Sequence, residues 1–237
     1  MVLILAPDWF LGFDVAIEAF SFVILFIFFL LSIRNYKINK NRNLLYLGIG
    51  FFLIALAQLF SILTRFTLYY NVSLIREVGQ LIIHYHVLKS TDILYNLGFF
   101  FNRFLTLMGL YLIYKLHSKE RTFFDFTLII YFVFVLSWMS PLNSPTYYLY
   151  HITVLILIGL IIRDYILVYK KNGDSNTMTL IVALIVLFLG HLNFIFSAEQ
   201  AFYATGYILG LASYTILLVL MIRLLKYNKK YRSNSAI

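Results

Sequence analysis

The chain has 237 residues, of which 62% are hydrophobic and only 12% charged, and its formal net charge is +9. This composition excludes an ordinary soluble domain, because a soluble core of this size needs far less apolar surface. The chain has no cysteine, which excludes disulfides, thiolate metal sites and cysteine nucleophiles.

Taken in chain order, seven apolar stretches are long enough to cross a bilayer as helices, because a hydrocarbon core of about 30 Å needs about 17–25 residues. The sequence therefore predicts an all-α integral membrane protein that forms one domain over residues 1–237. Charged residues are expected to end the first span at Arg34 and the fifth at Arg163. The predicted spans cover residues 15–33, 44–66, 94–115, 123–139, 147–162, 178–196 and 201–225.

The connection between the second and third spans is expected to hold a further helix over about residues 74–90. Apolar side chains recur there at helical spacing, while Arg76, Glu77 and His84 fall on the other face. This pattern predicts a helix that lies in the membrane interface. His84 and His86 stand two positions apart and do not share a helical face, which favours interfacial histidines over half of a metal site.

Basic residues predict the orientation of the spans. Most of them gather in three turns and the tail, at residues 34–42, 115–121, 163–171 and 223–232. The opposite side has only Arg65, Arg76 and Lys89. Because basic loops are retained in the cytoplasm, we expect the N-terminus outside and the C-terminal tail of residues 226–237 inside. The expected location is the cytoplasmic membrane.

The net charge also predicts partners. A basic inner face attracts the anionic lipid of the inner leaflet, and this interpretation is favoured over nucleic-acid binding. The same turns and tail offer a docking surface to a cytoplasmic protein partner. Apart from these, membrane lipids are the expected contacts, and nucleic acid is not an expected partner.

The third span carries a charged side chain inside the apolar run from Asn96 to Lys115. Arg103 precedes Lys115 by twelve residues, which places it about 18 Å up the helix. An arginine at that depth costs at least about 2.5–3.5 kcal/mol unless it faces a partner or water. Two alternatives follow: Arg103 forms a buried pair with Glu18 or Asp14 that fixes packing, or it binds a ligand directly.

The two halves of the chain resemble each other, which predicts a 3+1+3 plan of parallel three-helix repeats. Leu31-Ser-Ile-Arg-Asn-Tyr36 at the end of the first span matches Leu160-Ile-Ile-Arg-Asp-Tyr165 at the end of the fifth. Parallel repeats of this kind occur in transporters, with the site between them. Here they would place Gln58, Arg103 and His191 around one cavity. The alternative is that apolar helices with basic inner ends look alike through composition alone.

Polar side chains concentrate in the outer halves of the spans, whereas the inner halves hold almost none. Buried polar groups need partners or water, so this distribution predicts an outward-facing polar pocket that is closed below by an apolar plug. The candidate ligand-binding residues are Glu18, Gln58, Asn96, Asn102, Arg103, His191, Asn193, Tyr203 and Tyr207.

The predicted function is that of a receptor- or sensor-like module that binds a small amphipathic or lipid-like ligand in this pocket. The alternative is a carrier of a small solute or lipid, built from the two repeats. A membrane enzyme is disfavoured, because its candidate catalytic groups form no catalytic or metal-binding motif. Those groups are Asp14, Glu18, His151 and His191. No catalytic residue, metal or cofactor is therefore expected.

Three seven-helix families share the predicted topology, but their motifs are absent. Opsins need a Schiff-base lysine in the seventh span, and residues 201–225 contain none, so retinal is not expected. G-protein-coupled receptors usually carry an acidic-Arg-Tyr triplet at the inner end of the third span, where this chain reads Tyr111-Leu-Ile-Tyr-Lys115. Sugar carriers of the three-one-three plan carry a Pro-Gln pair, which this chain lacks. The sequence alone assigns no family.

Overall fold

A computed structural model gives the fold of most of the chain. The backbone is described for residues 8–10, 12–40, 42–77, 81–116, 130–132, 144–196 and 200–234. Side chains are described for residues 9–10, 12–38, 40, 42–66, 96–116, 130–132, 147–196 and 200–226. Every secondary-structure element within these ranges is a helix, which confirms the predicted all-α class for the described part of the chain.

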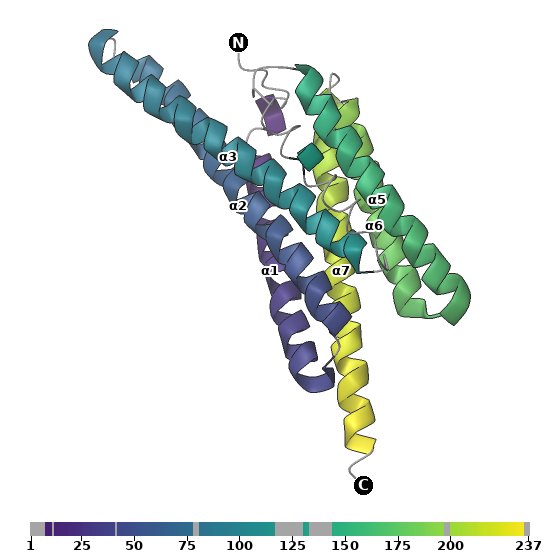
Figure 1. The fold of residues 1–237 in the computed structure, drawn as a ribbon. Coiled ribbons are helices and arrows are strands. Elements are labelled where there is room, and N and C mark those ends of the chain that lie inside the picture. Colours follow the sequence, from purple (N-terminus) through teal and green to yellow (C-terminus); the bar gives the residue numbers. More distant parts are fainter. Residues whose placement is uncertain are drawn as a thin grey trace.

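Long α-helices and one short 3₁₀-helix make up the described fold (Figure 1). The 3₁₀-helix η1 covers Asp8–Phe10, and residues 130–132 are also helical. The α-helices, in chain order, are α1 (Phe13–Asn39), α2 (Arg42–Glu77), α3 (Leu81–Lys115), α5 (Ser144–Asn172), α6 (Ser175–Ile195) and α7 (Gln200–Asn234).

The described part of the chain contains 6 helices that are long and apolar enough to cross a membrane. Their apolar stretches cover Phe13–Ile38, Arg42–Phe66, Asn96–Lys115, Tyr147–Asn172, Ser175–Ile195 and Gln200–Lys226. These match six of the predicted spans and make the chain a multi-pass membrane protein. The remaining predicted span, residues 123–139, lies outside the described residues except for 130–132. The count of seven spans therefore stays a prediction.

Helices α2 and α3 continue well beyond the spans predicted for them. The sequence predicts one interfacial helix over residues 74–90, but α2 runs unbroken to Glu77 and α3 begins at Leu81. The chain has no glycine or proline from residue 51 to residue 78, so nothing in the sequence ends α2 earlier. Gly79 stands between the two helices, inside the stretch predicted as one helix. That stretch is thus divided between two helices.

Charged residues do not end the helices where the sequence predicts. The fifth predicted span stops at Arg163, yet α5 continues through it to Asn172. It ends at Gly173, which has a left-handed φ of 61° and whose N–H donates to Tyr169 O at 2.8 Å. Glycine adopts this conformation at little steric cost, whereas a charged side chain leaves the backbone helical. Likewise, α7 continues through the basic tail to Asn234.

The helices form two groups of three that lie side by side (Figure 1). Within the groups, α2 packs against α1 and α3, and α6 packs against α5 and α7. The groups join through α1 with α7 and through α3 with α5. Along the chain, three of these helices precede the predicted linker span and three follow it, as the 3+1+3 plan requires. The repeat itself stays a prediction.

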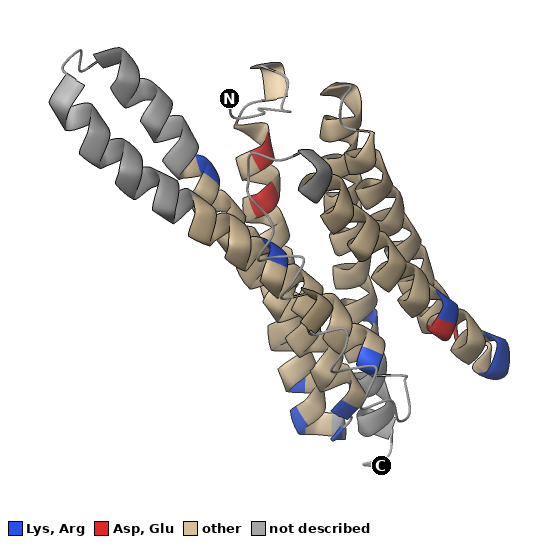
Figure 2. Cartoon of the chain, turned by 45° about the horizontal axis from the view of Figure 1, so that its top comes forward, with Lys and Arg blue, Asp and Glu red and all other residues tan. Residues whose placement is uncertain are grey.

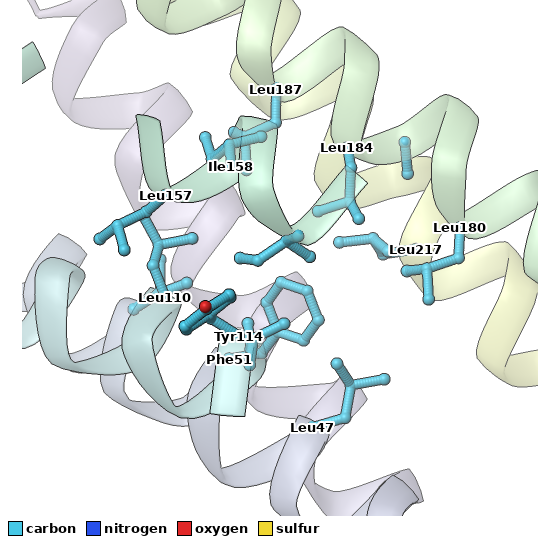
Figure 3. Packing of buried hydrophobic residues seen from close by; sticks show 14 of the residues in the cluster. Leu47, Phe51, Leu110, Tyr114, Leu157, Ile158, Leu180, Leu184, Leu187 and Leu217 are labelled. Carbon is cyan, nitrogen blue, oxygen red and sulfur yellow. The ribbon is translucent and has the colours of Figure 1, made fainter. Parts of the chain in front are cut away.

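A hydrophobic core joins the helices of both groups (Figure 3). Lipid tails are as apolar as these side chains, so close packing rather than the exclusion of water holds the core together. Every α-helix contributes to it, with Leu25 and Phe28 from α1, Phe51 and Ile54 from α2, Leu107 and Leu110 from α3, Leu157 and Ile158 from α5, Leu184 and Leu187 from α6, and Leu217 from α7.

Glycines bring α2 and α3 into direct backbone contact. A Cβ added at Gly109 would lie 2.6 Å from Gly50 O, and one added at Gly50 would lie 2.9 Å from Gly109 O. Contacts this short leave no room for a side chain, as at the small-residue interfaces common between membrane helices. Gly50 lies near the start of α2 and Gly109 near the end of α3. The two helices therefore touch at this end of the pair.

Candidate functional site

Two acidic residues of α1 face α2 and α7 near the start of α1. Asp14 and Glu18 stand one helical turn apart and are 0% and 2% exposed. The guanidinium of Arg65 bridges them: its Nη1 contacts Asp14 Oδ2, and its Nη2 lies 3.1 Å from Glu18 Oε1. Ser61 Oγ and Tyr207 OH donate to the same Glu18 oxygen at 2.8 and 3.2 Å. These five side chains are called the carboxylate network below.

The local sequence holds Asp14 at the start of α1. Its Oδ1 accepts hydrogen bonds from the Gly12 and Val15 N–H groups at 3.1 and 2.8 Å. The first turn of a helix leaves such donors without partners, and the positive end of the helix dipole also stabilises a carboxylate there. Asp14 therefore has both oxygens occupied, one by the backbone and one by Arg65.

Glu18 differs from Asp14 because one of its oxygens lacks a donor. Oε1 is contacted by Ser61, Arg65 and Tyr207, whereas Oε2 is buried and has no hydrogen-bond partner among the described residues. A buried carboxylate oxygen without a donor is costly, because its lost hydration is not replaced. The arrangement favours a further hydrogen at Oε2, either a proton on the carboxyl group or a donor from a bound molecule.

Aromatic rings pack around Tyr207 beside the network. The ring centroids of Phe10, Phe194 and Tyr203 lie 6.1, 5.1 and 5.0 Å from that of Tyr207. They come from η1, α6 and α7, so η1 packs onto this end of the bundle. Ring pairs at such distances contribute about 0.5–1.5 kcal/mol beyond their buried area. These four rings, called the aromatic cluster below, form an apolar wall next to Glu18.

Arg103 lies in a separate aromatic environment between α3 and α5. Arg103 is 4% exposed, and its Cζ lies 3.7 Å from the ring centroid of Phe99. The centroids of Tyr150 and Tyr147 are 4.8 and 5.9 Å from the same atom. Desolvated cation–π contacts are worth about 2 kcal/mol or more, so the rings offset part of the cost of burying the charge. The cation in contact with Glu18 is Arg65, not the predicted Arg103.

A histidine pair connects α5 and α6 close to these rings. His151 Nδ1 and His191 Nδ1 are 3.2 Å apart, so one nitrogen donates and the other accepts when both rings are neutral. The ring of His151 also packs against Tyr147 and Phe194, at centroid distances of 4.5 and 5.1 Å. Phe194 belongs to the aromatic cluster, so the pair borders that cluster. Among the residues that the structure describes, no group of three or more His, Asp or Glu could hold a metal ion.

Five of the predicted site residues fall into these neighbouring clusters. Glu18, Tyr203 and Tyr207 come together at the carboxylate network and the aromatic cluster. Arg103 lies among the rings between α3 and α5, and His191 forms the histidine pair. Phe194, which packs against both His151 and Tyr207, links the histidine pair to the first group.

The other predicted residues have different surroundings. Asn102 ties α3 to α2, because its Nδ2 donates to Ala57 O at 2.7 Å. Asn96 is exposed at the start of the apolar part of α3. Gln58 and Asn193 are half-buried. The depth of a residue in its span, which the sequence predicts, does not determine which neighbour it faces.

The sequence prediction missed Arg65, the residue that bridges the network. Arg65 stands near the end of the second predicted span, where a basic residue is typical of the membrane boundary. Helical spacing is the signal that points to it: Ser61 and Arg65 are four residues apart on α2, as Asp14 and Glu18 are on α1. The tyrosines beside Arg103 were missed because the chain has 19 tyrosines and no spacing marks these.

No family model matches the chain, and no curated protein or solved structure matches it. The chemistry of the chain's own residues is therefore the guide to its function. The carboxylate network is the strongest candidate site, because it combines buried acidic groups, an acceptor without a donor and an adjoining apolar wall.

Proposed function

We propose that the protein is a receptor- or sensor-like membrane module that binds a small amphipathic or lipid-like ligand at the carboxylate network. The observation that carries this proposal is Glu18 Oε2, a buried carboxylate oxygen without a donor among the described residues. A ligand head group with a hydrogen-bond donor would complete its hydrogen bonding, while the apolar part of the ligand would lie against the aromatic cluster. Glu18, Tyr203 and Tyr207 are then ligand contacts.

The histidine pair gives this site a route to the rest of the bundle. Phe194 packs against Tyr207 on the ligand side and against His151 on α5. A ligand that moves the rings of the aromatic cluster therefore also moves α6 against α5. Helix shifts of this kind are one of the ways in which a binding event is passed through a protein. The contacts of Arg103 with the rings of Tyr147 and Tyr150 favour its packing role, because they fix α3 against α5.

The part of the bundle away from the carboxylate network supports a sensor over a channel. In that part the hydrophobic core joins helices of both groups, and α2 and α3 are in backbone contact at Gly50 and Gly109. Packed apolar layers oppose the passage of an ion or a polar solute, because neither can replace its lost hydration. A ligand bound at the carboxylate network would act on this packing and need not cross it.

We place the ligand site on the outer side of the cytoplasmic membrane. Figure 2 shows two acidic stretches on α1 at one end of the bundle, with most lysines and arginines towards the other end. With the basic end in the cytoplasm, the N-terminus is outside and the C-terminus inside, which requires an odd number of spans. Residues 123–139 supply the seventh span in this proposal. The basic inner turns then meet anionic lipid and a cytoplasmic protein partner.

A carrier of a small solute or lipid is the second candidate, and the helix contacts favour it in one respect. If the two groups are repeats, α1, α2 and α3 correspond to α5, α6 and α7. The contact of α1 with α7 in one direction then corresponds to the contact of α5 with α3 in the other, and the structure has both contacts. Two-fold repeats about the membrane normal produce this pattern and occur in transporters.

Native mass spectrometry of the detergent-purified protein tests the ligand site. We expect a retained small molecule on the wild type and on Asp164→Asn, and its loss from Glu18→Gln. Asp164 is the matched control, because its carboxylate also lies on a spanning helix but pairs with the adjacent Arg163, whose side chain is 63% exposed. A molecule that stays on all three proteins would place it elsewhere and contradict the proposal.

If no molecule survives purification, added membrane lipid extract replaces it as the probe. The extract should raise the unfolding temperature of the wild type more than that of Glu18→Gln, and equal shifts would contradict the proposal. Liposomes then separate the sensor from the carrier. Vesicles that contain only this protein should not accumulate the bound molecule, whereas a carrier would take it up.

A further inference from the structure

The carboxylate network holds more acidic than basic groups. Asp14 and Glu18 both contact the guanidinium of Arg65. With both carboxyl groups ionised, these three side chains carry one excess negative charge. The hydroxyl groups around them are those of Ser61 on α2 and of Tyr203, Tyr207 and Tyr214 on α7. Hydroxyl groups donate hydrogen bonds, but they do not cancel the excess charge.

The excess charge is centred on one oxygen. Asp14 uses Oδ1 for the backbone and Oδ2 for Arg65, and Glu18 Oε1 is shared by several donors. Only Glu18 Oε2 is buried without a hydrogen-bond partner among the described side chains of the network. A buried charge is tolerated when it is paired or neutralised. Two states meet this requirement: a proton bonded to Oε2, or a cation bound at it.

The wall beside Glu18 is suited to a cation. Aromatic ring faces carry partial negative charge, and rings together with a carboxylate recognise organic ammonium groups. The aromatic cluster places the rings of Phe10, Phe194 and Tyr203 against Tyr207, which itself donates to Glu18. Arg65 already uses this property, because its Cζ lies 5.1 Å from the ring centroid of Tyr207.

We infer that the polar group of the ligand is a protonated amine, which binds at Glu18 Oε2 in exchange for the proton of the Glu18 carboxyl group. This inference rests on the proposed function, because it names the ligand class of the same site. In the exchange, the O–H bond of the carboxylic acid breaks and its proton passes to water. An ammonium N–H of the ligand then donates to Oε2. One positive charge enters as another leaves, so the site stays neutral.

The exchange makes amine binding depend on pH. Each ammonium group bound releases one proton, so the apparent affinity rises about tenfold per pH unit while the empty site is protonated. The dependence disappears at higher pH, where the empty site is already ionised. An alcohol with the same tail releases no proton, so its affinity does not change with pH.

Three amphiphiles with one tail and different head groups test the inference: octylamine, octanol and octanoate. Their binding to the full chain in lipid nanodiscs is measured as the shift in unfolding temperature at a series of pH values. We expect octylamine to bind the wild type at least about tenfold more tightly than octanol, and octanoate to produce no shift. Glu18→Gln keeps the size of the side chain but cannot ionise, so it should lose this preference. Asp164→Asn should behave like the wild type.

The outcomes separate this inference from the proposed function. Equal binding of octylamine and octanol to the wild type, lost in Glu18→Gln, would overturn the amine and leave the ligand site in place. Octylamine binding that is independent of pH would overturn the proton exchange, and this measurement needs no variant that folds. Octylamine binding that is unchanged in Glu18→Gln would remove Glu18 as the contact. If none of the three amphiphiles binds the wild type, the proposed function fails as well.

Discussion

At the scale of single residues, the half-buried Arg65 and the buried Arg103 show how positive charge is held inside a membrane protein. Arg65 contacts the carboxylates of Asp14 and Glu18, so ion pairs compensate its charge. Arg103 lies over the ring faces of Phe99 and Tyr150, which carry only partial charge. Arg65 bridges both carboxyl groups of the network, so its removal should disturb the site strongly.

Replacing Arg65 should destabilise the fold strongly. Arg65→Gln leaves two buried carboxyl groups without their cation, and such a loss costs about 3–5 kcal/mol. The matched control is Arg163→Gln, because the side chain of Arg163 is 63% exposed and pairs with Asp164. An exposed ion pair contributes about 0–1 kcal/mol. The free energy of unfolding in mixed micelles checks both values, and equal losses would refute the difference between the two sites.

Removing the hydroxyl of Tyr207 tests its hydrogen bonds to Glu18 and Arg65. Tyr207→Phe keeps the ring in the aromatic cluster and removes both the donor to Glu18 Oε1 and the acceptor of Arg65 Nη2. A hydrogen bond to a charged group such as the Arg65 guanidinium contributes about 1.5–3 kcal/mol, so we expect a loss in this range. Tyr46→Phe is the control, because the side chain of Tyr46 is 50% exposed and its change should stay within about 0.5 kcal/mol. The same unfolding measurement applies, and a Tyr207→Phe variant as stable as the wild type would contradict these hydrogen bonds.

At the scale of helices, six of the spans could be predicted from the sequence, but the ends of several of these helices could not. Length and apolarity decide whether a segment crosses a bilayer, and these are visible in the sequence. A helix does not stop at the membrane boundary, however, so α5 passes Arg163 and ends only at Gly173. For the same reason, α2 continues beyond its predicted span to Glu77.

The partners within the site were less predictable than the helices. Periodicity and position give the depth of Glu18 and Arg103 along their helices, α1 and α3. Which helices are neighbours depends on packing along their whole length, which no short pattern encodes. Since α1 lies against α2 and α7, Glu18 meets Arg65 and Tyr207. The contacts found for Arg103 are with rings of α3 and α5.

The contact of α2 with α3 should be sensitive to a single methyl group. Gly109→Ala would place its Cβ 2.6 Å from Gly50 O, and overpacking of this kind costs about 1–3 kcal/mol. Gly210→Ala is the matched control, because nothing lies within 4 Å of its Cβ position. Alanine favours a helix over glycine by about 1 kcal/mol, so the control should be neutral or slightly stabilising. Unfolding of the two variants in mixed micelles checks the prediction, and a harmless Gly109→Ala would contradict the backbone contact.

At the scale of the whole molecule, the two three-helix groups supply different parts of the proposed ligand site. The group of α1, α2 and α3 supplies the carboxyl groups and Arg65, whereas α6 and α7 supply most of the aromatic cluster. The ligand site thus lies where the groups meet. Because the hydrophobic core also joins the groups, we expect a structural change at the site to shift helices of both groups.

The proposed topology can be tested with single cysteines, because the chain has none of its own. Trp9→Cys and Lys226→Cys are suitable positions, since Trp9 is 67% exposed, Lys226 is also exposed, and they flank the first and last spans. Seven spans place them on opposite sides of the membrane. A membrane-impermeant maleimide added to intact cells should label Trp9→Cys only. Labelling of both positions, or of Lys226→Cys alone, would contradict the predicted spans or their orientation.

The most direct test of the central claim is the reaction of Glu18 with dicyclohexylcarbodiimide. This apolar reagent modifies carboxyl groups that are protonated within a membrane, and mass spectrometry of the digested protein locates the product. We predict modification of Glu18 in the empty protein, protection by octylamine but not by octanol, and no modification of Asp164, which is paired with Arg163. A Glu18 that does not react, or that reacts equally with octylamine present, would contradict a protonated carboxyl group that exchanges its proton for a ligand amine.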